Sequence, residues 1–303
     1  MKNSPADVAA IPIPATRRAS GSLADYFALT KPRLNFLVVA TSAAGYYLGG
    51  SSRPDIVSMT QAVGGTALVA GGAAVLNQLM ERDTDALMRR TRRRPLPDGR
   101  VSAGDARAFG LALSLAGLVL LAVRANWLSA GLALATLVVY LAVYTPMKRR
   151  TSLSTLVGAV PGALPALIGW TAAHGSISLG GAALFAIVFL WQIPHFMAIA
   201  WMYREDYGNA GFPMLAVIDP EGRRAGRQAV LYAAALVPVS LVPTFAGIAG
   251  SVYFGSALVL GVAMFVLAAR FAATRHERAA RALFFGSIIY LPLVWIVMIV
   301  DRW

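Results

Sequence analysis

Two short acidic clusters follow long apolar stretches of this 303-residue chain. The first contains Asn77, Glu81 and Asp85, whose four-residue spacing predicts one stripe on a continued helix, each about 40° further round than the last. The second is Glu205-Asp206. Amide and carboxylate oxygens are ligands that Mg²⁺ uses together with water and phosphate oxygens. Next to apolar helices, the two clusters therefore predict a site for a magnesium-bound isoprenoid diphosphate.

A different interpretation of the first cluster is a solvated helix end that pairs with its own arginines, for example Asp85 with Arg89 at i+4. Asp83 lies on nearly the opposite side of the predicted helix and is the weaker candidate. The run 89–94 holds five arginines in six residues, and two prolines soon after it keep this segment out of a helix. An arginine-rich loop of this kind could fold over a bound diphosphate, which favours the diphosphate site. The stripe alone is compatible with either a diphosphate site or a solvated helix end.

Hydrophobic residues make up 57% of the chain and charged residues only 14%, which indicates a polytopic membrane protein rather than soluble domains. Nine apolar runs are long enough to cross about 30 Å of hydrocarbon. The predicted spans are 34–50, 58–80, 106–123, 126–145, 153–172, 181–202, 228–249, 252–272 and 282–300. We expect an all-α bundle of nine transmembrane helices over residues 26–303, preceded by a disordered cytoplasmic tail over residues 1–25.

The distribution of basic residues predicts the orientation of the bundle. With the N-terminus in the cytoplasm, all Lys and Arg residues except Arg53, Arg124 and Arg302 fall on the cytoplasmic side. Both acidic clusters then face the cytoplasm from a bacterial inner membrane. The net charge of +13 is explained by this orientation and by anionic lipid heads, so we expect no nucleic-acid partner. The absence of cysteine excludes disulfides and thiolate metal sites.

His195 lies inside the sixth predicted span. On an ideal helix it shares a face with Met202 and Asp206, about 16 Å deeper than the latter. This placement predicts a cavity with a diphosphate at its mouth and a second substrate below. The alternative is that His195 bonds a backbone carbonyl freed by a kink at Pro194.

Several motifs together resemble the UbiA superfamily of membrane prenyltransferases over about residues 26–215. The matching segments are Leu29-Thr30-Lys31-Pro32-Arg33, 77–95, 144–151, 158–170, Pro194-His195-Phe196 and 205–215. The Asn-acid-acid stripe is typical of the superfamily, whereas the Thr-Lys-Pro-Arg entry, the Lys-Arg-Arg-Thr loop and the Pro-His-Phe turn are similar to its haem-modifying branch. Glu81 and Glu205 depart from the more familiar Asp, which keeps the charge and lengthens the side chain by a methylene.

The resemblance implies transfer of a farnesyl group from farnesyl diphosphate to a vinyl group of protohaem IX, with Mg²⁺ as cofactor. It implies catalytic and metal-binding roles for Asn77, Glu81 and Asp85 around one ion, and for Asp206 with Glu205 around a second. Candidates for gripping the diphosphate are Lys31, Arg33, Arg90, Arg94, Lys148 and Arg149. His195 becomes the candidate for contact with haem. A haem A synthase or a terminal oxidase is the expected downstream partner.

Two other functions remain open. One is a prenyltransferase of quinone biosynthesis acting on 4-hydroxybenzoate or a naphthoate, which shares the diphosphate site and needs no haem pocket. The other is a cation-coupled transporter, which predicts acidic residues near the middle of the bilayer on broken helices. No acidic residue falls inside a predicted span here, so the transporter ranks below either enzyme.

Overall fold

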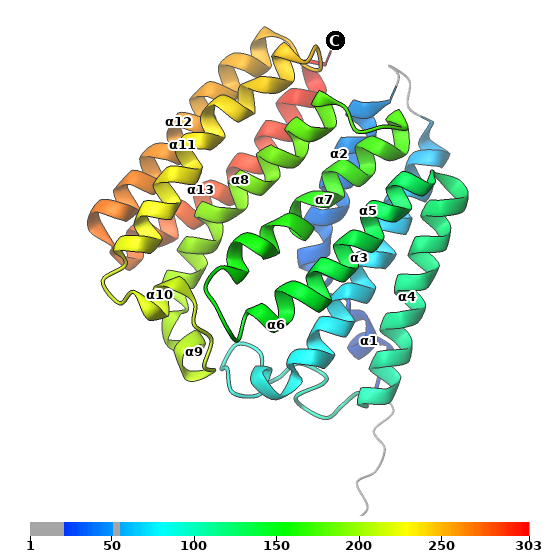
Figure 1. Ribbon diagram of the computed structural model, residues 1–303, viewed down its shortest axis with the longest axis vertical. Helices are drawn as coiled ribbons and strands as arrows, with labels where there is room; N and C mark the ends of the chain where they lie inside the picture. Colours follow the sequence, from blue (N-terminus) through cyan, green and yellow to red (C-terminus); the bar gives the residue numbers. More distant parts are fainter. Residues whose placement is uncertain (1–20, 51–54, 303) are drawn as a thin grey trace, which may run out of the picture.

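The computed structural model describes residues 21–50 and 55–302, and this part of the chain forms a helical bundle without named strands (Figure 1). The elements are α1 (Leu23–Leu29), α2 (Pro32–Gly49), α3 (Ile56–Asp85), α4 (Ala103–Arg124), α5 (Trp127–Val138), the π-helix η1 (Val139–Tyr144), α6 (Thr145–Met147), α7 (Ser154–His174), α8 (Leu179–Met202), α9 (Arg204–Asn209), α10 (Leu215–Ile218), α11 (Arg223–Phe245), α12 (Ser251–Thr274) and α13 (Glu277–Val300). The all-α prediction is therefore confirmed for the described residues.

Eight helices within the described residues are long and apolar enough to cross a membrane. They are α3, α4, the continuous run of α5, η1 and α6, and then α7, α8, α11, α12 and α13. Each coincides with a predicted span. The first predicted span falls on α2, which has 18 residues and is not among the eight. Of the predicted tail, residues 1–20 lie outside the described part, and α1 already begins at Leu23.

Helix α2 begins with the polar or turn-forming residues Pro32, Arg33 and Asn35, which lower its mean hydropathy, and it packs closely against α7. Small residues allow the two backbones to touch. A Cβ added at Gly169 of α7 would overlap the carbonyl oxygen of Ser42, and one at Gly45 of α2 would overlap that of Ala166. Such close approach is how helices associate in a bilayer, where burial of apolar surface alone gives no preference for a neighbouring helix over lipid.

Helix α8 occupies the centre of the second half of the bundle, packed against α7, α11 and α13. Its buried residues include Trp191, Ile193 and Trp201. The helix continues through Pro194 but ends at Met202, and α9 starts separately after it. The predicted single face from His195 to Asp206 is therefore wrong, because the chain leaves helical geometry at Tyr203, where φ is −111° and ψ is 22°.

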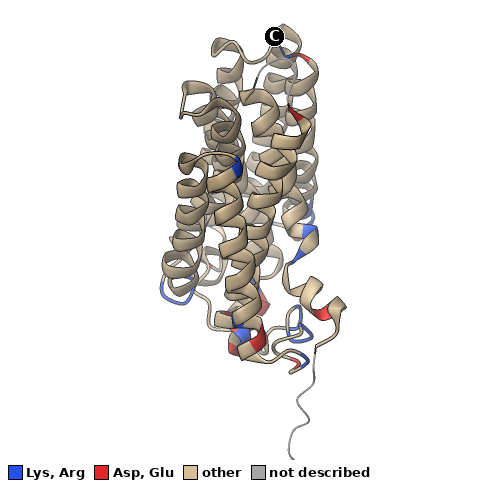
Figure 2. Ribbon diagram, turned by 90° about the vertical axis from the view of Figure 1, so that its right-hand side faces the viewer, with Lys and Arg blue, Asp and Glu red and all other residues tan. Residues whose placement is uncertain are grey.

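The connections after α3, α6 and α8 meet at one end of the bundle (Figure 1). Figure 2 shows that most Lys, Arg, Asp and Glu residues gather at this end, while the opposite end, where the chain terminates, holds few. The charged connections thus lie at the same end of the bundle as the last turns of α3, which carry the first acidic cluster.

Candidate active site

The stripe of Asn77, Glu81 and Asp85 occupies the last turns of α3 and faces the interior of the protein. The three residues are 1%, 8% and 1% exposed. The side chain of Asp83, on the other side of the same helix, is 89% exposed and pairs with Arg82 at 3.1 Å. The helix therefore separates one outward acid from three inward oxygen-bearing side chains, as the four-residue spacing predicts.

Asn77 joins three segments that are far apart in the sequence. Its Oδ1 accepts hydrogen bonds from Lys31 Nζ and from the Tyr140 hydroxyl, both at 3.3 Å. Its Nδ2 donates to Thr145 Oγ1 at 3.0 Å. A buried amide satisfied from both sides has one orientation, so the Oδ1 atom is held toward Lys31.

Lys31 is placed by an unusual backbone conformation. It is the N-cap of α2 with φ 50°, in the left-handed region that non-glycine residues rarely adopt. Burial lowers the pKa of Lys31 to about 7, and the positive charges of Arg94 and Lys148 lower it further. Because burial is the main cause, an anion bound beside Lys31 would favour its ammonium form.

Both carboxylates of the stripe are paired with cations from later segments. Lys148 Nζ lies 2.9 and 3.1 Å from the two oxygens of Glu81. Arg94 Nη1 lies 2.6 Å from Asp85 Oδ2. The pairing of Asp85 with Arg89 considered from sequence is therefore replaced by one with Arg94, because the chain turns back over the helix end instead of continuing as a helix. The Thr91 hydroxyl fixes this turn by donating to the Asp85 carbonyl at 2.7 Å.

Tyr140 and Thr145 are site residues that sequence reasoning missed. Tyr140 lies in the π-helix η1 and Thr145 directly follows it, and Thr145 Oγ1 donates to the carbonyl of Tyr140 at 2.8 Å. Hydrogen bonds in a π-helix span five residues, one more than in an α-helix. The rings of Tyr140 and Tyr144 stack with centroids 5.4 Å apart, and Lys148 Nζ lies 4.7 Å from the Tyr144 centroid. Single-turn π-segments are frequent at functional sites, but hydrophobic periodicity gives no signal for them.

The second acidic cluster lies on α9, where Glu205 is exposed and Asp206 is half-buried. It is connected to the arginine-rich segment through Arg90, whose guanidinium carbon lies 5.2 Å from the centroid of the Tyr203 ring. Arg90 Nη2 also donates to the Tyr207 hydroxyl at 3.4 Å. The segments that follow α3 and α8 therefore close over the same end of the bundle.

The structure brings together only some of the predicted diphosphate ligands. Lys31, Arg94 and Lys148 direct their charged groups at the α3 stripe, whereas Arg90 lies at the second cluster. Arg33 and Arg149 are exposed. Of the six predicted residues, the structure therefore brings together three cations that could bind an anion beside the stripe.

The donor set of the stripe fits Mg²⁺ in one specific way. Asn77, Glu81 and Asp85 offer only oxygen ligands, which a hard divalent cation prefers. Within the described residues, however, no three His, Cys, Asp or Glu side chains are grouped closely enough to enclose a metal ion. The stripe would thus supply a partial ligand set for Mg²⁺, and phosphate oxygens and water would complete the coordination.

His195 is held on α8 by contacts with α13. Its Nδ1 lies 2.7 Å from the Ser287 hydroxyl, and its ring stacks on Trp191 and Phe284 with centroids 5.1 Å away in each case. The partner is thus a side-chain hydroxyl and not a backbone carbonyl freed at Pro194.

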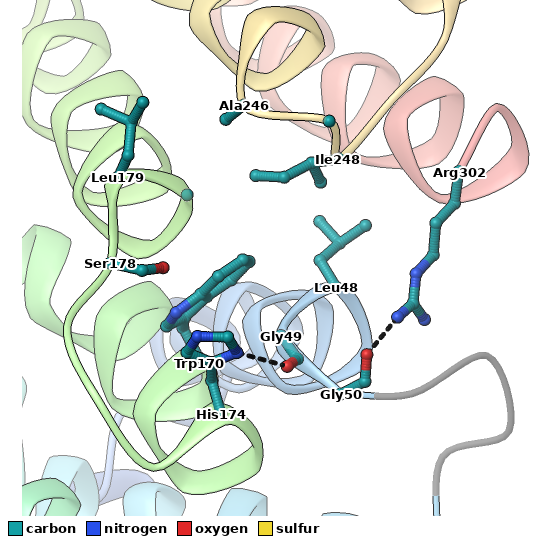
Figure 3. Close-up of a pocket in the computed structure, with 12 residues that line it drawn as sticks. Leu48, Gly49, Gly50, Trp170, His174, Ser178, Leu179, Ala246, Ile248 and Arg302 are labelled. Atoms are coloured by element: carbon teal, nitrogen blue, oxygen red, sulfur yellow. Dashed lines mark hydrogen bonds between the residues drawn. The ribbon is translucent and has the colours of Figure 1, made fainter.

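A cavity of about 370 Å³ lies at the opposite end of the bundle, far along α2 and α8 from the acidic clusters (Figure 3). His174 contacts the Gly49 carbonyl at 3.3 Å, and Arg302 donates to the carbonyls of Tyr47 and Gly50. These side chains satisfy the free carbonyls at the C-terminus of α2, so they stabilise a helix end.

Comparison with known proteins identifies the class of this protein. Residues 38–289 match the UbiA prenyltransferase family, so the chain belongs to that family. A protoheme IX farnesyltransferase from Solibacter usitatus is 47% identical over 287 residues, covering 92% of this chain and 98% of that protein. A protoheme IX farnesyltransferase from Koribacter versatilis is 44% identical over 290 residues, covering 92% and 94%.

Solved structures show the same fold. A digeranylgeranylglyceryl phosphate synthase superposes with a TM-score of 0.79 at 18% identity, covering 92% of this chain and 98% of the other. A UbiA homolog from Archaeoglobus fulgidus, bound to GPP and Mg²⁺, has a TM-score of 0.65 at 17% identity and covers 90% and 99%. The family match and the curated relatives confirm the predicted resemblance to membrane prenyltransferases, and these structures confirm the fold.

Proposed function

We propose that this protein transfers the farnesyl group of farnesyl diphosphate to a vinyl group of protohaem IX, forming haem O and releasing diphosphate. The observation that carries the proposal is the buried stripe of α3 facing three inward cations at the charged end of an apolar bundle. Relatives named for this reaction share 42–47% identity over at least 90% of the chain, which supports haem as the acceptor.

Charge neutralisation is the chemistry that the site supports. The allylic carbon–oxygen bond of farnesyl diphosphate breaks when the leaving group is stabilised, and Lys31, Arg94 and Lys148 are positioned to bind its oxygens. Mg²⁺ held by Asn77, Glu81 and Asp85, with a second ion at Asp206 and Glu205, would supply further positive charge to the leaving group. The vinyl electrons form the new carbon–carbon bond, water adds to the vinyl-derived carbon left electron-deficient, and the released proton passes to diphosphate or solvent.

The apolar part of the reaction takes place deeper in the bundle. We place haem against His195 on α8 and the farnesyl chain between it and the diphosphate site. The segments closed over the end through Arg90 exclude bulk water while the allylic cation exists.

We further propose that α2 crosses the membrane as a ninth span. The N-terminus and the charged end then face the cytoplasm of a bacterial inner membrane. The excess of basic residues at this end supports the orientation (Figure 2). The product would pass to a haem A synthase or directly to a terminal oxidase.

The test is an acceptor competition with purified protein in lipid nanodiscs, supplied with farnesyl diphosphate and Mg²⁺. Protohaem IX, 4-hydroxybenzoate and a naphthoate are offered separately, and the products are analysed by mass spectrometry. We expect farnesylated haem only, and none after chelation of the metal. Prenylation of a phenolic acid with unreacted haem would show instead that the enzyme belongs to quinone biosynthesis.

The transporter alternative is disfavoured by the same geometry. The buried acids lie at the last turns of α3, at one end of the bundle, and α3 is continuous over its 30 residues. An ion site at the middle of a broken helix is what a coupled transporter requires.

A further inference from the structure

The contacts of Ser287 determine which nitrogen of His195 carries a proton. The Ser287 hydroxyl lies 2.6 Å from the carbonyl of Phe284, a distance at which it donates its single proton to that oxygen. The same hydroxyl lies 2.7 Å from His195 Nδ1. With its proton already used, the hydroxyl can only accept there, so Nδ1 carries the hydrogen. A neutral imidazole then presents the lone pair of Nε2.

The ring of His195 has aromatic neighbours and one hydrogen-bond partner, which contacts Nδ1. Trp191 and Phe284 stack on the ring at interplanar angles of 20° and 25°. Ser287, itself 0% exposed, covers the Nδ1 edge. His195 nevertheless retains intermediate exposure, and no described hydrogen bond involves its Nε2.

Ser287 is also fixed against rotation or withdrawal. Its own carbonyl accepts a hydrogen bond from Trp191 Nε1 at 2.7 Å, one turn of α8 away from His195. Helices α8 and α13 are thus joined by two polar contacts around one serine, in a region otherwise packed with apolar side chains. Such a supported contact is typical of groups that orient a metal-binding imidazole.

We propose that Ser287 is a positioning residue for the haem acceptor: by accepting the Nδ1–H of His195 it holds the tautomer whose Nε2 lone pair ligates the haem iron. This inference rests on the proposed contact between His195 and haem, and it assigns a role to α13.

The experiment measures haem binding without the transfer reaction. Protohaem IX is titrated into the full-length protein in nanodiscs without farnesyl diphosphate, following the Soret band and the iron–histidine vibration of the ferrous complex. We expect Ser287→Ala to weaken haem binding about 10–100-fold and to shift the iron–histidine vibration, as loss of a partner to a ligating histidine typically does. Ser287→Thr keeps the hydroxyl and should restore both signals.

Ser240 of α11 provides a matched control. It is also 0% exposed, donates to a carbonyl three residues earlier at 2.8 Å, and has a carbonyl that accepts from an aromatic side chain, Tyr253, at 2.7 Å. It lacks a histidine partner in the described contacts. Ser240→Ala should therefore leave haem affinity and the vibration unchanged.

The outcomes separate the two proposals. An iron–histidine signal that persists in His195→Ala overturns the contact between His195 and haem. A signal lost in His195→Ala but unchanged in Ser287→Ala overturns the role of Ser287 and leaves the contact standing. Equal losses in Ser287→Ala and Ser240→Ala, or no restoration by Ser287→Thr, would show that packing and not the hydroxyl is responsible, and would also overturn the role of Ser287.

Discussion

Replacing Asp85 by Asn tests the α3 stripe most directly, because Asp83 on the same helix end is a matched control. Each acid has one arginine partner, Arg94 at 2.6 Å for Asp85 and Arg82 at 3.1 Å for Asp83. The two side chains differ in location, since that of Asp85 is 2% exposed and that of Asp83 is 89% exposed. A diphosphate site on the inward face predicts that Asp85→Asn lowers activity beyond its effect on stability, whereas Asp83→Asn does not.

The expected magnitudes follow from this difference. Asp85→Asn weakens the proposed binding of Mg²⁺, whose positive charge stabilises the leaving group, and should lower kcat/KM by about 10²- to 10³-fold. The free energy of unfolding of Asp85→Asn should fall by about 1.5–3 kcal/mol, the usual net value of a hydrogen bond to a charged group. The fall is smaller if Arg94, whose side chain is 25% exposed, turns to water. Asp83→Asn removes an exposed pair worth about 0–1 kcal/mol and should behave like wild type.

The assay is the initial rate of haem farnesylation in nanodiscs at saturating Mg²⁺, with thermal unfolding measured on the same preparations. Comparable activity of the two variants would refute the assignment of the stripe, whichever of them is less stable. A fall in activity of Asp85→Asn that only follows a loss of folded protein would refute the catalytic role while leaving the ion pair as a structural contact.

Three other variants are informative. Lys148→Met should raise the KM for farnesyl diphosphate at least about tenfold, because about 1.4 kcal/mol of charge interaction is lost. Arg149 is exposed, so Arg149→Met should have little effect on this KM. Steady-state kinetics in which Arg149→Met has the higher KM would contradict the assignment. Tyr140→Phe should lower kcat/KM only about 3–10-fold, the value of one hydrogen bond, and a far larger loss would mean that the phenol acts on substrate. Gly169→Ala should lower the unfolding temperature in detergent, because the added methyl group overlaps the backbone of α2. Gly131→Ala should preserve or raise it, because no atom lies near the added methyl group. The reverse order would disprove the close contact between α2 and α7.

The features predicted correctly from sequence are those set by local periodicity. A run of apolar residues defines where a helix can cross a bilayer, and residues four apart share a helix face regardless of the rest of the fold. The eight long apolar helices and the burial of Asn77, Glu81 and Asp85 follow from these rules. The exposure of Asp83 follows for the same reason.

The features that were missed depend on long-range contacts or local departures from helix geometry. Asn77 bonds Lys31 and Tyr140, which are 46 and 63 positions away, and no spacing rule selects them. The break at Tyr203 and the π-helix η1 each alter which side chains share a face, so an ideal helix misplaced Asp206 and concealed Tyr140. Arg94 replaced Arg89 as the partner of Asp85 because the intervening chain is a turn and not a helix.

The internal pairing of Glu81 with Lys148 and of Asp85 with Arg94 has a consequence for the order in which ligands assemble. A solitary divalent ion must compete with resident ammonium and guanidinium groups, so it gains little by entering alone. Arrival of a polyphosphate attracts those cations and frees the acid oxygens for coordination. Each ligand thereby strengthens the other's affinity by the same factor. The empty enzyme is therefore expected to ignore abundant cellular cations and to take up its metal only together with the prenyl donor.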